Sequence, residues 1–405
     1  MKISESIIAP KGFAATGAHV GIKKQKKDLS LILSKYPCEA AACYTTNTVK
    51  AAPVEWDMSI TNSKKKVYGI VTNSGNANAC TGPRGKDDTQ KMAEAFAQSA
   101  GCAADEILVC STGVIGVYMP TDIVTQGITQ TFKNLGETEN DFTLAAEAIM
   151  TTDTFMKTAS AQISINGTEV NLLGMAKGSG MIHPNMATML SYIITDCAIT
   201  KTALDFAVKE AVNDTFNMIT VDADTSTNDT LLVLANGAAG NECITGKNGA
   251  YEIFKEAIFE ICKKLATDIA KDGEGATKLM EVTVLGALTL CDARKIAKSV
   301  ASSNLFKAAL FGADANWGRV LCAMGYSGGK FDPAKVDVTI ENEKGSVKLC
   351  ENGEPVQFSE EAATQVLSEN KVCIQISLNQ GNLSATAWGC DLTYDYVKIN
   401  GDYRS

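Results

Sequence analysis

The feature that most constrains the fold is an alternation of short apolar runs with longer amphipathic segments. Residues 67–71 and 107–110 are apolar almost throughout, which is typical of buried strands. Between them, 87–100 carries apolar residues at helical spacing and ends at Gly101, which predicts a helix with a glycine C-cap. Further strands are predicted at 189–194, 231–234, 281–285, 336–340 and 372–378, and further helices around 204–212 and 254–265. We therefore expect an α/β fold class, mixed α+β with layered sheets and helices, although the pattern does not determine the strand order.

One hairpin is also expected. Residues 162–172 alternate between apolar and polar side chains on both sides of Asn166-Gly167. Asn-Gly favours the tight two-residue turn that joins antiparallel strands. The sequence therefore predicts two adjacent strands in this region.

Composition excludes several kinds of site. The 405 residues include 37 Lys+Arg and 46 Asp+Glu, a net charge of −9, which argues against nucleic acid or an anionic membrane as partner. With only two histidines, His19 and His183, any His-based triad or metal site must use one of them, and we expect no metal. The thirteen cysteines form no Cys-x-x-Cys pair, which favours reduced thiols. No signal peptide and no apolar run of about 18 residues are found, so we expect a cytoplasmic protein.

The segment 174–194 has the most unusual pattern in the chain. Three glycines and Pro184 precede an apolar run that starts at Thr188, directly after Ala187. If the chain is cut before Thr188, the freed α-amine can act as the base for the adjacent hydroxyl, and no histidine is needed. The same hydroxyl can make the cut by attacking the carbonyl of Ala187. From the pattern alone, an ordinary β-branched strand residue is the alternative interpretation of Thr188.

Residues 177–190, KGSGMIHPNMATML, resemble the signature of the ornithine acetyltransferase family. These enzymes are the glutamate N-acetyltransferases of arginine biosynthesis, and some are bifunctional N-acetylglutamate synthases as well. Other motifs similar to those of the family follow in the same order at 12–13, 21–24, 73–79, 111–116, 151–154, 272–278 and 400–405. The resemblance therefore spans essentially the whole chain. It implies a self-processing N-terminal-nucleophile fold of the ornithine acetyltransferase/aminopeptidase type.

The resemblance implies a specific processing and reaction. Cleavage between Ala187 and Thr188 would give an α chain, 1–187, and a β chain, 188–405, in an α2β2 heterotetramer. Thr188 would then accept the acetyl group of N2-acetylornithine and pass it to glutamate, releasing ornithine and N-acetylglutamate without a cofactor. Whether acetyl-CoA is a second donor is left open. Because the α-amine is the base, we expect no catalytic part for His183.

The resemblance also implies roles for named residues. Thr112 and Gly113 match the oxyanion hole, where a hydroxyl and a backbone N–H stabilise developing negative charge. The resemblance further implies that the substrate is bound by Thr151, Lys177, Thr188, Glu274, Asn400 and Ser405. Lys177 suits an α-carboxylate and Glu274 an ammonium group. Taken without the family, the residues around Thr112 predict only a polar turn, and Lys177 and Glu274 are more often surface charges.

Two other functions are carried as alternatives. A hydrolase on the same scaffold would pass the acyl group to water instead of an amine. A binding protein without activity would use the glycine-rich segment only as a loop. An assay of N-acetylornithine with and without glutamate distinguishes the hydrolase from the acetyltransferase. Two chains on a denaturing gel of protein expressed from one gene argue against the binding protein.

Overall fold

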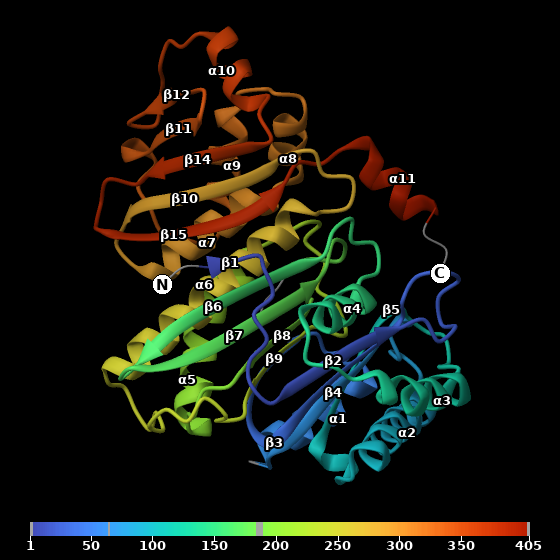
Figure 1. Ribbon diagram of the computed structural model, residues 1–405. Helices are drawn as coiled ribbons and strands as arrows, with labels where there is room; N and C mark the ends of the chain where they lie inside the picture. The colour runs from blue at the N-terminus through green and yellow to red at the C-terminus, as the bar shows by residue number, and fades with distance from the viewer. Residues whose placement is uncertain (1–2, 64, 184–188, 403–405) are drawn as a thin grey trace.

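The computed structural model describes residues 3–63, 65–183 and 189–402. They form two sheet-based units, one above the other in the ribbon view (Figure 1). The larger unit contains a nine-stranded sheet in the order β1-β6-β7-β8-β9-β3-β4-β5, with β2 paired to β3. The smaller unit contains a six-stranded sheet in the order β13-β12-β11-β14-β10-β15. The predicted mixed α/β fold class is confirmed.

The strands of the larger sheet are β1 (Ile3–Ser4), β2 (Phe13–Ala18), β3 (Leu29–Tyr44), β4 (Val67–Asn76), β5 (Ile107–Val114), β6 (Lys157–Ile165), β7 (Thr168–Lys177), β8 (Leu190–Thr195) and β9 (Thr230–Ala235). Its helices are α1 (Ala52–Asn62), α2 (Gly82–Ala100), α3 (Thr121–Thr131), α4 (Glu139–Ile149), α5 (Lys201–Asn213) and α6 (Gly249–Lys271). Alternate side chains of each central strand enter two cores. Along β8, Tyr192 and Ile194 pack in a core that includes Phe142 of α4, whereas Ile193 packs with Val208 of α5 and Ile261 of α6.

The strands of the smaller unit are β10 (Leu279–Ala287), β11 (Asp337–Asn342), β12 (Gly345–Glu351), β13 (Glu354–Pro355), β14 (Lys371–Ser377) and β15 (Leu383–Cys390). Its helices are α7 (Leu290–Ser302), α8 (Asn304–Phe311), α9 (Trp317–Gly325) and α10 (Glu360–Leu367). The last helix, α11 (Tyr394–Asp402), leaves this unit and reaches toward the larger one (Figure 1). No helix in the described ranges is long and apolar enough to cross a bilayer.

The local predictions are largely confirmed. Strands β6 and β7 form the predicted hairpin, with φ of 49° at Asn166 and 87° at Gly167. Helix α2 ends as predicted, since Gly101 adopts the left-handed conformation with φ of 74°. It begins earlier than the apolar pattern indicates, at Gly82, because Pro83 is favourable in a first helical turn even though that turn is polar.

The strand order could not be derived from the sequence, and it has a direct consequence for the predicted α and β chains. β8 pairs antiparallel with β7 and parallel with β9, and β9 pairs in turn with β3. Two strands from 188–405 therefore lie between strands from 1–187. A cut before residue 188 would leave two chains that share one hydrogen-bonded sheet, so the predicted boundary does not coincide with the two structural units.

Candidate active site

Six of the predicted site residues line one cavity of about 150 Å³. The cavity is lined by Ala77, Thr112, Gly113, Ile115, Thr151, Thr152, Lys177, Gly180, Met181, Ser226, Thr227, Asn228, Glu274 and Asn400. Three further predicted residues, Ala187, Thr188 and Ser405, lie outside the described residues. In the sheet, Leu190, two positions after Thr188 in the sequence, lies opposite Lys177 on β7 and Thr230 on β9.

Lys177 lies at the last position of β7, and its side chain enters the cavity. Its Nζ donates hydrogen bonds to Thr112 Oγ1 at 3.0 Å and to Thr151 Oγ1 at 3.1 Å. Burial lowers the pKa of the ammonium group, and the carboxylate of Asp153 acts in the opposite direction. Because lysine only donates, the hydroxyl hydrogens of both threonines remain available to another acceptor. The arrangement thus places an ammonium group and two hydroxyl donors at one point of the cavity.

Thr112 and Gly113 belong to β5 itself and do not form the polar turn that the local sequence favours. β5 pairs in parallel with β4, and Thr112 lies opposite Ser74. Gly113 has φ of 131°, and a Cβ at this position would overlap the backbone of Gly75. Only glycine therefore fits where the two strands meet beside the cavity.

Asn228 is a cavity residue that the sequence analysis missed. It is buried, and its Nδ2 donates to the backbone oxygens of Ala77 at 2.6 Å and Ser111 at 2.8 Å. Its Oδ1 accepts from Thr227 Oγ1 at 2.6 Å. Asn228 thereby joins the loop after β4 to the strand that carries Thr112. The one feature of the sequence that could have marked Asn228 as a site residue is its position two residues before the apolar run of β9.

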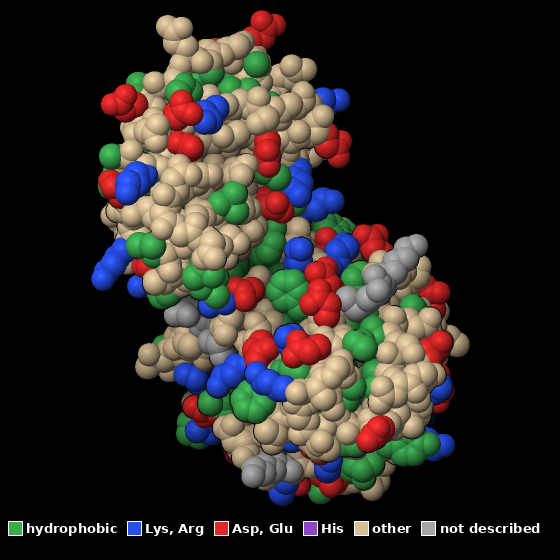
Figure 2. Space-filling model, turned by 90° about the vertical axis from the view of Figure 1, so that its left-hand side faces the viewer, with side chains coloured by type: hydrophobic (Ala, Val, Ile, Leu, Met, Phe, Trp, Pro, Cys, Tyr) green, Lys and Arg blue, Asp and Glu red, His purple; other side chains and the backbone are tan. Residues whose placement is uncertain are grey.

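The C-terminal helix brings Asn400 to Glu274. Asn400 Nδ2 donates to Glu274 Oε2 at 2.9 Å, and the backbone N–H of Glu274 donates to Ser179 O at 2.9 Å. The Glu274 carboxylate lies so close to Gly180 that a Cβ there would overlap it. The lining of the cavity therefore includes the carboxylate of Glu274 as well as the ammonium group of Lys177. Acidic and basic side chains also lie close together at the waist between the two units in the space-filling view (Figure 2).

Comparison with known proteins identifies the family. The family model described as "ArgJ family" matches residues 14–405. The chain belongs to the ArgJ family. The resemblance to the ornithine acetyltransferase family that the sequence motifs indicate is thus confirmed.

The similarity to ArgJ-family proteins extends over nearly the full length. The protein named "Arginine biosynthesis bifunctional protein ArgJ" from Caldanaerobacter subterraneus subsp. tengcongensis is 51% identical over 396 residues, covering 98% of each chain. Its namesake from Symbiobacterium thermophilum is 53% identical over 407 residues, covering 100% of this chain and 99% of that protein. A solved ArgJ chain from Bacillus halodurans is 46% identical with a TM-score of 0.50, and the match covers 52% of this chain and 98% of that chain.

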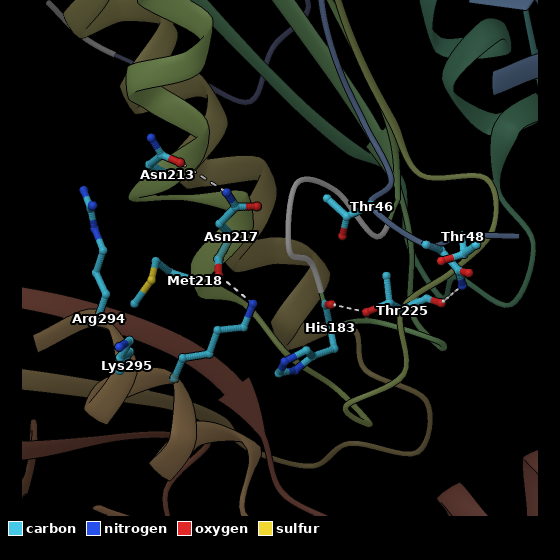
Figure 3. A pocket seen from close by; sticks show the side chains of 11 residues that line it. Thr46, Thr48, His183, Asn213, Asn217, Met218, Thr225, Arg294 and Lys295 are labelled. Carbon is cyan, nitrogen blue, oxygen red and sulfur yellow. Dashed lines mark hydrogen bonds between the residues drawn. The ribbon is translucent and has the colours of Figure 1, made fainter. Parts of the chain in front are cut away.

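Neither histidine of this ArgJ-family chain lines the cavity that contains Thr112. His183 lies in a second cavity of about 770 Å³, where its backbone oxygen accepts from Thr225 Oγ1 at 2.9 Å (Figure 3). Its Nδ1 lies 3.0 Å from Thr220 Oγ1, and burial, with a smaller effect of Lys298, lowers the pKa of the ring to about 4. His19 is a surface residue whose Nδ1 lies 2.9 Å from Lys26 O. That His183 has no catalytic part stays a prediction.

Among the residues that the structure describes, no three His, Cys, Asp or Glu side chains lie close enough to hold a metal ion. The expectation that the reaction needs neither a metal nor a cofactor stays a prediction.

Proposed function

We propose that this chain is a self-processing acetyltransferase of arginine biosynthesis. It moves the acetyl group of N2-acetylornithine to glutamate through an acetyl ester on Thr188, giving ornithine and N-acetylglutamate. The observation that carries the proposal is the full-length ArgJ-family match, whose motif residues Thr112, Thr151, Lys177 and Glu274 line one cavity.

The proposed chemistry combines Thr188, which lies outside the described residues, with groups that line that cavity. The Thr188 hydroxyl attacks the acetyl carbonyl and gives its proton to its own α-amine, and the oxyanion is stabilised by the Thr112 hydroxyl and the Gly113 N–H. Collapse breaks the amide bond, and ornithine leaves with the proton on its amine. The amine of glutamate then attacks the ester, and Thr188 regains its proton. Lys177 pairs with the α-carboxylate that both amino acids carry, and Glu274 pairs with an ammonium group.

Two observations support self-cleavage before Thr188. The solved ArgJ chain from Bacillus halodurans is almost fully matched by only 52% of this chain, whereas the curated relatives match over their full length. A chain of about half length is the size expected after one cut near the middle. The sheet order supports an uncut precursor that folds first, since β8 and β9 lie between β7 and β3. We propose that the two chains stay together as an α2β2 heterotetramer in the cytoplasm.

A second activity is favoured by the names of the relatives, which call them bifunctional. We propose that acetyl-CoA also acetylates Thr188, so that N-acetylglutamate is made without N2-acetylornithine. Incubation of the purified protein with acetyl-CoA and glutamate tests this directly. Formation of N-acetylglutamate and free CoA is expected, and no product above the level of a Thr188→Ala control would restrict the protein to recycling.

The main activity is tested by kinetics and mass spectrometry together. With N2-acetylornithine alone, the β chain should gain one acetyl group and release one ornithine per site. With glutamate added, initial rates should give parallel double-reciprocal lines, as expected for a covalent intermediate. Continued ornithine release without glutamate would instead identify a hydrolase. Intersecting lines with no acetylated β chain would contradict the ester intermediate.

A further inference from the structure

Beside the cavity, a lysine is buried between two aspartates. Lys157 Nζ lies 2.7 Å from Asp153 Oδ1 and 2.5 Å from Asp272 Oδ2, and no side chain of the three is more than 2% exposed. Two carboxylates and one ammonium leave an excess of one negative charge, and an uncompensated buried charge is strongly destabilising. Lys177, which is also buried, supplies the second positive charge. The four groups together are therefore neutral.

The same aspartates connect three segments that contribute residues to the cavity lining. Asp153 Oδ1 accepts from the N–H of Gly178 at 2.7 Å, and its Oδ2 accepts from the N–H of Thr151 at 2.9 Å. Asp272 Oδ2 accepts from the N–H of Thr154 at 3.0 Å. Gly178 directly follows Lys177, and Asp272 lies two positions before Glu274. The cluster thus joins the segments that carry Thr151, Lys177 and Glu274.

Asp153 and Lys177 also act on each other electrostatically. Burial alone would raise the pKa of Asp153, but Lys157, Lys177 and hydrogen bonds lower it to about 2, so it is ionised throughout the neutral range. Burial lowers the pKa of Lys177, Asp153 opposes that effect most strongly, and Lys157 adds to it. The other charged groups that act with Lys177 are Asp229 and Glu274, which raise its pKa, and Lys23, whose own pKa is lowered by the charge of Lys177.

We propose that Asp153 is a positioning residue that keeps Lys177 protonated and directed into the cavity, while Lys157 limits this effect by pairing with Asp153 and Asp272. The inference rests on the proposed role of Lys177 as the partner of the substrate α-carboxylate. It adds that the affinity of the site for carboxylate ligands at alkaline pH is set by a residue that need not touch the substrate.

The test is the pH dependence of N-acetylglutamate binding, measured by calorimetry between pH 6 and pH 10. This probe carries carboxylates but no titratable amine, so a falling affinity at high pH reports a group of the protein. Among the charged groups that raise the pKa of Lys177, Asp153 has the largest effect. Asp153→Asn should therefore move the alkaline loss of affinity to lower pH, so that N-acetylglutamate binds more weakly than to the wild-type protein on that limb.

For a second variant, Lys157→Met, we expect the alkaline loss of affinity to shift in the opposite direction. This substitution removes the positive charge that disfavours a charged Lys177, so the loss of affinity should move to higher pH. Asp196→Asn is the matched control, since Asp196 is equally buried and accepts backbone N–H bonds from Asn171 at 2.8 Å and Lys11 at 3.0 Å at the far end of β8. It should leave the pH profile unchanged. Circular dichroism and thermal melting establish which variants are folded.

The outcomes separate the inference from the proposed function. A downward shift in Asp153→Asn, or an upward shift in Lys157→Met if the first variant does not fold, supports the inference. A folded Asp153→Asn with the wild-type profile overturns it, as does an equal shift in Asp196→Asn. If the wild-type protein itself binds no N-acetylglutamate at any pH, the proposed substrate role fails, and the inference fails with it.

Discussion

Replacement of Thr112 by valine is the most direct test of the proposed oxyanion hole. The two side chains have nearly the same shape, so the cavity wall is preserved while the hydroxyl is removed. In the wild-type protein that hydroxyl accepts from Lys177 Nζ at 3.0 Å, which leaves its own hydrogen for the substrate oxygen. The substitution therefore removes one donor toward the oxyanion and one acceptor from the buried ammonium group.

The two losses differ in size and in the step that they affect. Loss of one oxyanion donor typically costs about 10²–10³ in kcat, or about 2.7–4 kcal/mol of transition-state stabilisation. Loss of a hydrogen bond to a charged group costs about 1.5–3 kcal/mol, and it acts on the resting protein. Thr151 Oγ1, at 3.1 Å, still accepts from Lys177. The first loss should therefore appear in kcat, and the second in thermal stability or KM.

The assay follows acetyl transfer from N2-acetylornithine to glutamate and uses Thr112→Ser as the matched control. Serine keeps the hydroxyl, so its kcat should stay within about tenfold of wild type. A denaturing gel first measures the processed fraction of each variant, because self-cleavage also passes through an oxyanion, and rates are expressed per processed chain. If Thr112→Val and Thr112→Ser turned over at similar rates per processed chain, Thr112 would be only a wall of the cavity.

Three further substitutions test other parts of the proposal. Thr188→Ala should leave one uncut chain on a denaturing gel, because a methyl group cannot attack a carbonyl, and two chains from this variant would disprove self-cleavage by Thr188. Gly113→Ala should lower the free energy of unfolding, measured by thermal melting, by about 1–3 kcal/mol, because alanine at this φ is strained and its Cβ would overlap Gly75. Gly116→Ala is the control: φ is 82°, but an added Cβ would meet nothing within 4 Å, so this substitution should cost less. His183→Gln should retain most of the wild-type kcat, and a loss comparable to that of Thr112→Val would give His183 a catalytic part.

The local structure of this protein followed from its sequence. The hairpin at Asn166-Gly167, the C-cap at Gly101 and the central strands were predicted because turn geometry, left-handed glycine and apolar runs depend on residues close in the chain. The motifs around Thr112 and Lys177 also indicated the family and a set of site residues, six of which line one cavity.

The contacts that complete the site were decided only by the tertiary structure. Lys157 meets Asp272 across 115 positions, Asn228 meets Ser111 across 117, and Asn400 meets Glu274 across 126. None of these pairs has a local pattern, because each depends on which strands and helices lie side by side. The central position of β8 and β9, for instance, follows from burying apolar side chains on both faces of the sheet. Charge balance and hydrogen bonding around Lys177 are properties of that packing, so they could not be derived from residue spacing.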